Sequence, residues 1–204
     1  MLLQHVLLAI VWTVYCVLHS VLADLRVKNW VQQKAGKSFR YYRLFYTLFA
    51  AIALAALVLY QFSMTSLDVY RPTIFTNIVG GLVAVSGLAV MVICIQKYFL
   101  SLSGLRSLYQ ETPAAELMIA GIHRYMRHPL YTGTFLAIWG FWIIFPTLSL
   151  LITDAIITVY TLLAIQLEEE KLVAAFGDQY RRYQRTVPKL IPRFVGRKLL
   201  AERT

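Results

Sequence analysis

Two clusters of ionisable side chains with opposite charge flank one long apolar run. The first contains Arg127 and His128 and ends at Pro129, and the second is a run of three glutamates at 168–170. If the apolar run between them, 130–167, forms a membrane-length hairpin, both clusters return to the same side of a bilayer. A site with cationic and anionic groups side by side can bind a zwitterionic, partly cationic ligand at the membrane surface.

Each cluster also has a simpler explanation. Arg127 and His128 can be interfacial residues that flank a helix, and the glutamates can be a solvated helix end paired with arginines of the tail. However, adjacent carboxylates repel one another, and the dipole of a helix disfavours negative charge at its C-terminus. We therefore expect a cation, from an arginine or from a ligand, to compensate for these glutamates.

A third group lies far from both clusters in the sequence. His19 and Ser20 stand at the end of the first apolar segment. A histidine near the end of a membrane segment can serve as a general base, or it can simply bond a neighbouring carbonyl. Asp154, in the last apolar segment, is expected to be interfacial or bonded within its helix.

The elements that must position these residues are membrane helices. Of the 204 residues, 59% are hydrophobic and only 15% are charged, whereas a soluble domain carries about 25% charged residues. Because about 20 apolar residues cross a bilayer as a helix, the sequence predicts an all-α integral membrane protein with about five transmembrane helices. The expected spans are 2–23, 41–62, 74–95, about 130–145 and 148–167, with the fourth short for a full crossing.

Proline and glycine residues give further detail on how the spans turn and pack. Pro146 is the expected turn between the last two spans, which form the hairpin. Glycines in the third and fourth spans predict close packing of membrane helices. We expect a single membrane domain over 1–204, with three N-terminal spans in 1–95 and a ligand-binding region in 96–204 that includes a possible interfacial helix at 97–109.

The tail after the last span is expected to be a helical cap. Phe176, Tyr180 and Tyr183 are spaced by four and three residues, so they share one helix face. The arginines between them point elsewhere, and Pro188 and Pro192 end the helix. This pattern predicts an amphipathic helix that lies at the lipid headgroups.

The distribution of charge predicts the topology. The net charge is +10, and all twenty lysines and arginines except Arg71 fall in segments on one side of the five spans. The positive-inside rule makes that side cytoplasmic, with the N-terminus outside and the C-terminus inside. The basic excess is therefore explained by topology and by contact with anionic membrane lipids, and we expect no nucleic-acid partner.

The ordered combination of these features resembles a known family, the integral membrane methyltransferases of the isoprenylcysteine carboxyl methyltransferase type and their relatives that methylate phospholipids and small thiols. The shared pattern is Gly-x-aromatic-x-x-x-Arg-His-Pro-x-Tyr, an apolar hairpin, Glu-Glu, then Phe-Gly-x-x-Tyr-x-x-Tyr and a Val-Pro/Ile-Pro ending. This chain supplies Gly121, Arg127, His128, Pro129, Tyr131, Glu168, Glu169, Phe176, Gly177, Tyr180, Tyr183, Val187, Pro188, Ile191 and Pro192. The N-terminal half, with Leu18-His19-Ser20, looks like the bacterial branch that contains methanethiol S-methyltransferases.

The resemblance implies S-adenosylmethionine as methyl donor, in a cytoplasm-facing pocket covered by the tail, and a location in the bacterial inner membrane. Glu168 would take the ammonium of the donor's methionine part, and methyl transfer would depend mainly on positioning and exclusion of water. The other residues expected around the donor are Glu116, Leu117, Met118, His123, Arg127, His128, Pro129 and Tyr131.

Two departures from the family pattern bear on the acceptor and the donor. His123 stands where the family has another aromatic residue, and Ala164 stands where isoprenylcysteine methyltransferases hold the substrate carboxylate with an arginine. A free prenylcysteine carboxylate therefore fits poorly, and a small thiol, an amine lipid or another lipophilic acceptor fits better. For a thiol, the candidate bases are His19 and Glu169, and no metal is expected.

A non-catalytic membrane protein is the alternative, either a transporter or a subunit of a redox system. A transporter places polar groups near the midplane of several spans, whereas this chain gathers them at one side. A haem subunit needs paired histidines within spans, and the four histidines do not supply such pairs. The sequence therefore favours the methyltransferase hypothesis. It gives no indication of the oligomeric state.

Overall fold

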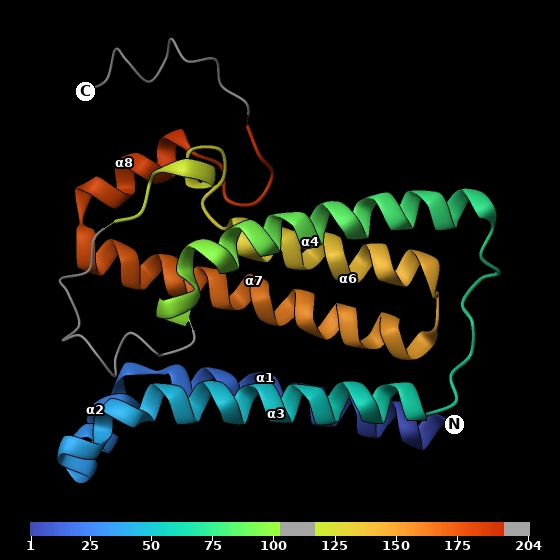
Figure 1. Cartoon of the computed structure of the whole chain (residues 1–204), viewed down its shortest axis with the longest axis horizontal. Helices are drawn as coiled ribbons and strands as arrows, with labels where there is room; N and C mark the ends of the chain where they lie inside the picture. Colours follow the sequence, from blue (N-terminus) through green and yellow to red (C-terminus); the bar gives the residue numbers. More distant parts are fainter. Residues whose placement is uncertain (103–116, 194–204) are drawn as a thin grey trace.

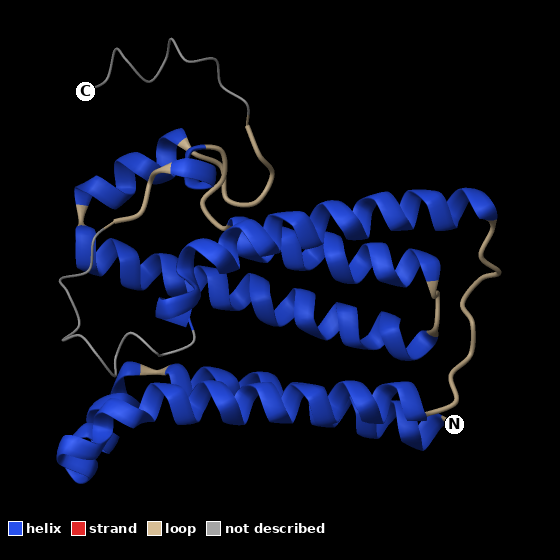
Figure 2. Ribbon diagram, viewed as in Figure 1, coloured by secondary structure: helices blue, strands red, loops and turns tan. Residues whose placement is uncertain are grey.

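The computed structural model describes residues 1–102 and 117–193, and these residues form helices and no strand (Figures 1 and 2). The prediction of an all-α membrane protein is confirmed. Three helices, α1, α4 and α7, and the helical run that includes α3 are long and apolar enough to cross a membrane, and α6 is a shorter apolar helix. The elements are α1 (Leu2–Ala23), α2 (Leu25–Ala35), η1 (Gly36–Tyr41), α3 (Tyr42–Ser63), α4 (Ile74–Leu102), η2 (Gly121–Arg124), α6 (Pro129–Ile144), α7 (Leu148–Phe176) and α8 (Asp178–Thr186).

The bundle has two layers of helices, and the helix axes in both layers are roughly aligned. In Figure 1, α1 and α3 lie side by side below, and α4, α6 and α7 lie above them. The two layers meet mainly where α1 packs against α7. The predicted turn at Pro146 is confirmed, since α6 ends at Ile144 and the Thr147 side chain caps the start of α7 by accepting from the Leu150 N–H.

The last span is longer than the sequence suggested. The span was expected over 148–167 with the glutamates at its C-terminal end, but α7 continues through them to Phe176. It stops only at Gly177, whose φ of 55° is a backbone conformation that favours glycine. The expectation that the glutamates sit at a helix C-terminus is therefore wrong. Consecutive helical positions point about 100° apart, so the glutamates face different surroundings.

The closest packing in the fold is between α4 and α6. A Cβ atom added at Gly87 would lie 2.6 Å from the carbonyl oxygen of Gly133, and one added at Gly80 would lie 2.8 Å from that of Gly140. Both contacts are with backbone, which cannot rotate away as a side chain can. The glycines therefore let the two backbones touch, as expected for helices that associate in lipid, and this pair forms a rigid support for the start of α6.

We predict that Gly87→Ala lowers the thermal unfolding temperature of the detergent-solubilised protein. The added methyl group must push α4 away from α6, and overpacking of this kind costs about 1–3 kcal/mol. Gly81→Ala is the matched control, because a Cβ at Gly81 meets nothing within 4 Å. Its expected effect is a slight stabilisation, since alanine is a better helix former than glycine. Equal unfolding temperatures for the two variants would contradict this packing.

A polar network holds α1, α3 and α7 together at a distance from the charged clusters. Gln61 Oε1 accepts from the Trp12 indole at 3.2 Å and from the Thr153 hydroxyl at 3.0 Å. The neighbouring Asp154 was expected to be interfacial or bonded within its helix, and only 3% of it is exposed. The interfacial alternative is therefore wrong. Within α7 its backbone carbonyl accepts from the Thr158 hydroxyl at 2.6 Å, whereas its side-chain Oδ2 is buried without a hydrogen-bond partner among the described residues.

The connection between the first two spans is helical, which the sequence reading missed. Asp24 caps α2 by accepting from the Arg26 N–H at 2.8 Å, and its other carboxylate oxygen lies 3.7 Å from Lys171 Nζ of α7. Helix α2 is polar, so its sequence resembles a loop, and its order comes from this cap and from contacts with α1 and η1.

Candidate active site

Glu169 is the centre of a buried ion-pair network at the end of the bundle that carries α8. Its Oε1 accepts from Arg127 Nε at 2.8 Å and from His128 Nε2 at 3.0 Å. Its Oε2 accepts from Gln184 Nε2 at 3.3 Å and lies 3.6 Å from Lys189 Nζ. The side chains of Arg127 and Glu169 are only 9% and 10% exposed. Two positive charges therefore compensate Glu169, and both of its oxygens are engaged.

Pro129 keeps the segment that carries Arg127 and His128 outside helix α6. Pro129 is the first residue of α6, and His128 before it has the non-helical angles φ −121° and ψ 64°, as expected for a residue that precedes proline. The freed backbone N–H groups of Arg127 and His128 donate to the carbonyls of Pro188 and Lys189 at 2.9 and 3.1 Å. Two backbone hydrogen bonds thus hold the tail against the start of α6.

Arg127 joins three parts of the chain. Besides its bond to Glu169, its Nη1 donates to the carbonyl oxygens of Gln184 and Val187 at 2.7 and 2.9 Å. These two carbonyls lie at the end of α8, where the last carbonyls lack partners within the helix. One buried guanidinium therefore fixes α6, α7 and α8 relative to one another.

Helix α8 covers this network from the outside, so the predicted helical cap is present. Tyr180 and Tyr183 are buried with Val187, and Leu117 and Phe176 pack against them. The Tyr183 hydroxyl donates to the carbonyl of His123 at 2.6 Å. Burial, together with the nearby charge of Glu169, raises the pKa of Tyr180, so this tyrosine stays neutral.

Glu168 differs sharply from Glu169. Its side chain is 46% exposed and its Oε2 lies 3.8 Å from His128 Nδ1. Tyr131, one turn into α6, stacks on the His128 ring with centroids 5.7 Å apart, and its hydroxyl interacts with the Glu168 carboxylate. Neighbouring glutamates thus have separate surroundings, one sealed inside the network and the other accessible to a ligand beside two aromatic rings.

The structure brings most of the predicted residues together, and some lie elsewhere. Glu116 lies outside the described residues, and Met118 is exposed. His123 belongs to the assembly through its backbone, and its Nδ1 lies 3.1 Å from the carbonyl oxygen of Arg127. His19 belongs to a different group on α1 and α3, where the Tyr46 hydroxyl lies 3.0 Å from its ring nitrogens.

Sequence reasoning missed Gln184 and Lys189 as members of the network. Gln184 adjoins the predicted tyrosine stripe, and Lys189 stands between the two prolines of the tail. Those prolines were read only as helix terminators. The available signal was that prolines end α8 and prevent further helix, which leaves the tail free to turn back to the Arg-His-Pro segment and to bring a cation with it.

Comparison with known proteins identifies the family of the chain. Residues 73–179 match the model of the family described as phospholipid methyltransferase, and the match runs from α4 through the start of α8. The chain belongs to the phospholipid methyltransferase family. The resemblance drawn from the sequence is thereby confirmed, and the transporter and redox-subunit alternatives lose their basis.

Relatives of this phospholipid methyltransferase family member include enzymes that act on small thiols. The methanethiol S-methyltransferase of Crocosphaera subtropica is 33% identical over 195 residues, which cover 91% of this chain and 73% of the relative. That of Mycobacterium tuberculosis is 32% identical over 192 residues, covering 88% and 74%. The protein-S-isoprenylcysteine O-methyltransferase of Schizosaccharomyces pombe is 35% identical over 77 residues, covering 37% and 33%. No solved structure matches the chain.

Proposed function

We propose that the chain is an S-adenosylmethionine-dependent membrane methyltransferase that methylates a thiol at the cytoplasmic face of the bacterial inner membrane. The observation that carries the proposal is the accessible Glu168 carboxylate beside a sealed Arg127–His128–Glu169 network, within a family of methyltransferases. The gathering of cations on one side of the spans supports the proposed topology, with the N-terminus outside and the C-terminus inside.

The residues at this end of the bundle fit a zwitterionic donor. Glu168 is half exposed and can accept from an ammonium group, and its side chain lies beside His128 and Tyr131. Among the other residues proposed for the donor, Leu117 packs against the tyrosines of α8 and His123 contacts the Arg127 carbonyl. Pro129 follows His128, and Glu116 and Met118 flank Leu117 in the sequence. When bound, S-adenosylmethionine supplies an electrophilic methyl group on a sulfonium. The protein's task is to orient this group and exclude water.

Arg127 and Glu169 have a positioning role in this proposal. Glu169 was a candidate general base, but four side chains donate to or pair with its oxygens from within the network. A base needs a free lone pair within reach of the proton it takes. We therefore assign Glu169 to holding His128 and Arg127 in place, and we keep His19 as the candidate base.

The acceptor is assigned from the relatives and from Ala164. Two relatives that cover most of the chain are named methanethiol S-methyltransferases. Ala164, one helical turn before Glu168, is too short to hold a substrate carboxylate. Both points support a thiol, which needs a base to become the more nucleophilic thiolate.

Calorimetry and product analysis on the detergent-solubilised protein test this function. We expect micromolar binding of S-adenosylmethionine and conversion of methanethiol to dimethyl sulfide. His128→Ala should lose binding at least tenfold. His19→Ala should bind the donor normally but turn over roughly 100-fold more slowly, as general-base removal predicts. A well-folded wild type that binds no S-adenosylmethionine would overturn the proposal and leave a non-catalytic membrane protein.

A further inference from the structure

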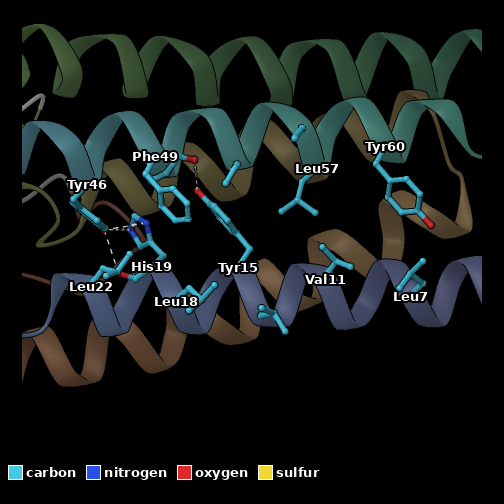
Figure 3. A pocket seen from close by; sticks show the side chains of 14 residues that line it. Leu7, Val11, Tyr15, Leu18, His19, Leu22, Tyr46, Phe49, Leu57 and Tyr60 are labelled. Atoms are coloured by element: carbon cyan, nitrogen blue, oxygen red, sulfur yellow. Dashed lines mark hydrogen bonds between the residues drawn. The ribbon is translucent and has the colours of Figure 1, made fainter. Parts of the chain in front are cut away.

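A groove of about 500 Å³ lies between α1 and α3. None of the described residues that line it belongs to the network around Glu169. Figure 3 shows Leu7 and Tyr60 at one end and His19, Leu22 and Tyr46 at the other. At a rise of 1.5 Å per helical residue, Leu7 and Leu22 lie about 22 Å apart. The groove is therefore long and narrow, with the dimensions of an extended hydrocarbon chain rather than of a compact ligand.

The groove is apolar along its length and open at its side. Its walls are leucine, valine, alanine and aromatic side chains. Leu7, Leu18 and Phe49 line it and are 46%, 45% and 44% exposed. Because α1 and α3 are membrane-spanning by length and composition, these exposed side chains face lipid. An apolar molecule dissolved in the bilayer can thus enter sideways without crossing water.

The larger group of polar atoms that could bind a head group lies at the His19 end of the groove, while the Leu7 end has the Tyr60 hydroxyl. The Tyr46 hydroxyl lies 3.0 Å from the ring nitrogens of His19, as drawn in Figure 3. Next to His19, the Ser20 hydroxyl lies 3.0 Å from that of Tyr160 on α7. We therefore expect an occupant of the groove to have an apolar chain and a polar end at His19.

This polar end is connected to the proposed donor site through α7. The Ser20 hydroxyl next to His19 lies 3.0 Å from the Tyr160 hydroxyl of α7. Glu168 follows Tyr160 by eight residues on the same helix, which is about 12 Å along its axis. Helix α7 therefore links the His19 end of the groove to Glu168, the residue assigned to the donor.

We propose that the groove binds the methyl acceptor, and that this acceptor is a single-chain amphiphile with an apolar chain and a terminal thiol. The proposal rests on the function proposed above and narrows its substrate class. The chain lies between α1 and α3, and the thiol lies at His19 and Tyr46. The S–H proton passes to the unprotonated nitrogen of His19 as the acceptor sulfur forms its bond to the methyl group. The donor sulfonium keeps the electron pair of the broken bond and leaves as a neutral thioether.

Thiols of increasing chain length test this assignment in the full-length protein. We compare kcat/KM for methanethiol, hexane-1-thiol and dodecane-1-thiol in detergent micelles. Each methylene that leaves water for an apolar groove contributes roughly three- to fourfold in affinity until the groove is filled. We therefore expect kcat/KM to rise by at least tenfold from methanethiol to the longer thiols.

Substitutions at two alanines of α3 distinguish binding of the thiol in the groove from its dissolution in the micelle. Ala53 lines the groove, whereas Ala55 is exposed and does not. Ala53→Phe fills the groove and should lower kcat/KM for dodecane-1-thiol at least tenfold more than for methanethiol. Ala55→Phe adds the same ring to the same helix in the same micelle and should leave this ratio as in the wild type.

The outcomes distinguish the inference from the function on which it rests. If methanethiol is methylated but chain length has no effect, or if both variants behave alike, the groove is a seat for bilayer lipid and the inference is overturned. If no thiol is methylated and S-adenosylmethionine does not bind, the proposed function itself fails. A chain-length effect lost only in Ala53→Phe supports the inference.

Discussion

Glu168→Gln should remove donor binding while leaving the protein folded. The substitution keeps the shape of the side chain but removes the charge assigned to the donor ammonium. Hydrogen bonds to charged groups contribute about 1.5–3 kcal/mol, so affinity should fall by one to two orders of magnitude. Because the Glu168 side chain is 46% exposed, no buried charge is left uncompensated. Calorimetry gives the affinity, and thermal unfolding should show little change.

Glu170→Gln is the matched control for this experiment. It makes the same chemical change at an exposed position of the same helix, two residues away. Its affinity for S-adenosylmethionine should equal that of the wild type. If Glu170→Gln weakens binding as much as Glu168→Gln does, the effect comes from the general negative potential, and Glu168 has no specific role.

Arg127→Ala should have the largest effect on the protein as a whole. The guanidinium is nine-tenths buried, pairs with Glu169 and donates to two carbonyls at the end of α8. Removing one partner of a buried pair costs about 3–5 kcal/mol, because the remaining charge loses its compensation. We expect a large fall in the unfolding temperature, earlier proteolysis of the tail, and loss of donor binding.

The exposed Arg124 supplies the control, since Arg124→Ala removes the same side chain three residues away. Its free energy of unfolding should stay within about 0.5 kcal/mol of the wild-type value, the usual range for surface changes. Arg127→Lys should recover only part of the loss, because lysine lacks the fork that reaches Glu169 and two carbonyls at once. Full recovery with lysine would show that charge alone matters at this position.

Local signals in the sequence were sufficient for the helices and for the existence of the site. The apolar segment at 2–23 is α1 with the same bounds, and Pro146 marks the turn between α6 and α7. Pro129 correctly predicted the non-helical backbone of His128. Each of these features depends on neighbouring residues, so a single sequence can reveal it.

Features that depend on distant residues could not be predicted in this way. The sequence offered no reason to seal Glu169 rather than Glu168, because that choice is made by Gln184 and Lys189 from the returning tail. The end of α7 was placed too early because the hydrophobic pattern stops before the helix does. Helix α2 was missed for another reason, because its sequence is polar like that of a loop and its order comes from the Asp24 cap and from contacts with α1 and η1.

The dependence of Glu169 on the tail has a consequence for truncated chains. Gln184 and Lys189 lie after every apolar helix in the sequence, so a chain that stops before Gln184 has all of its spans but lacks two partners of Glu169. In such a chain the carboxylate has only its partners from Arg127 and His128, and the bonds from the start of α6 to Pro188 and Lys189 are missing. Truncation of the tail should therefore leave the membrane helices in place and the charge network incomplete.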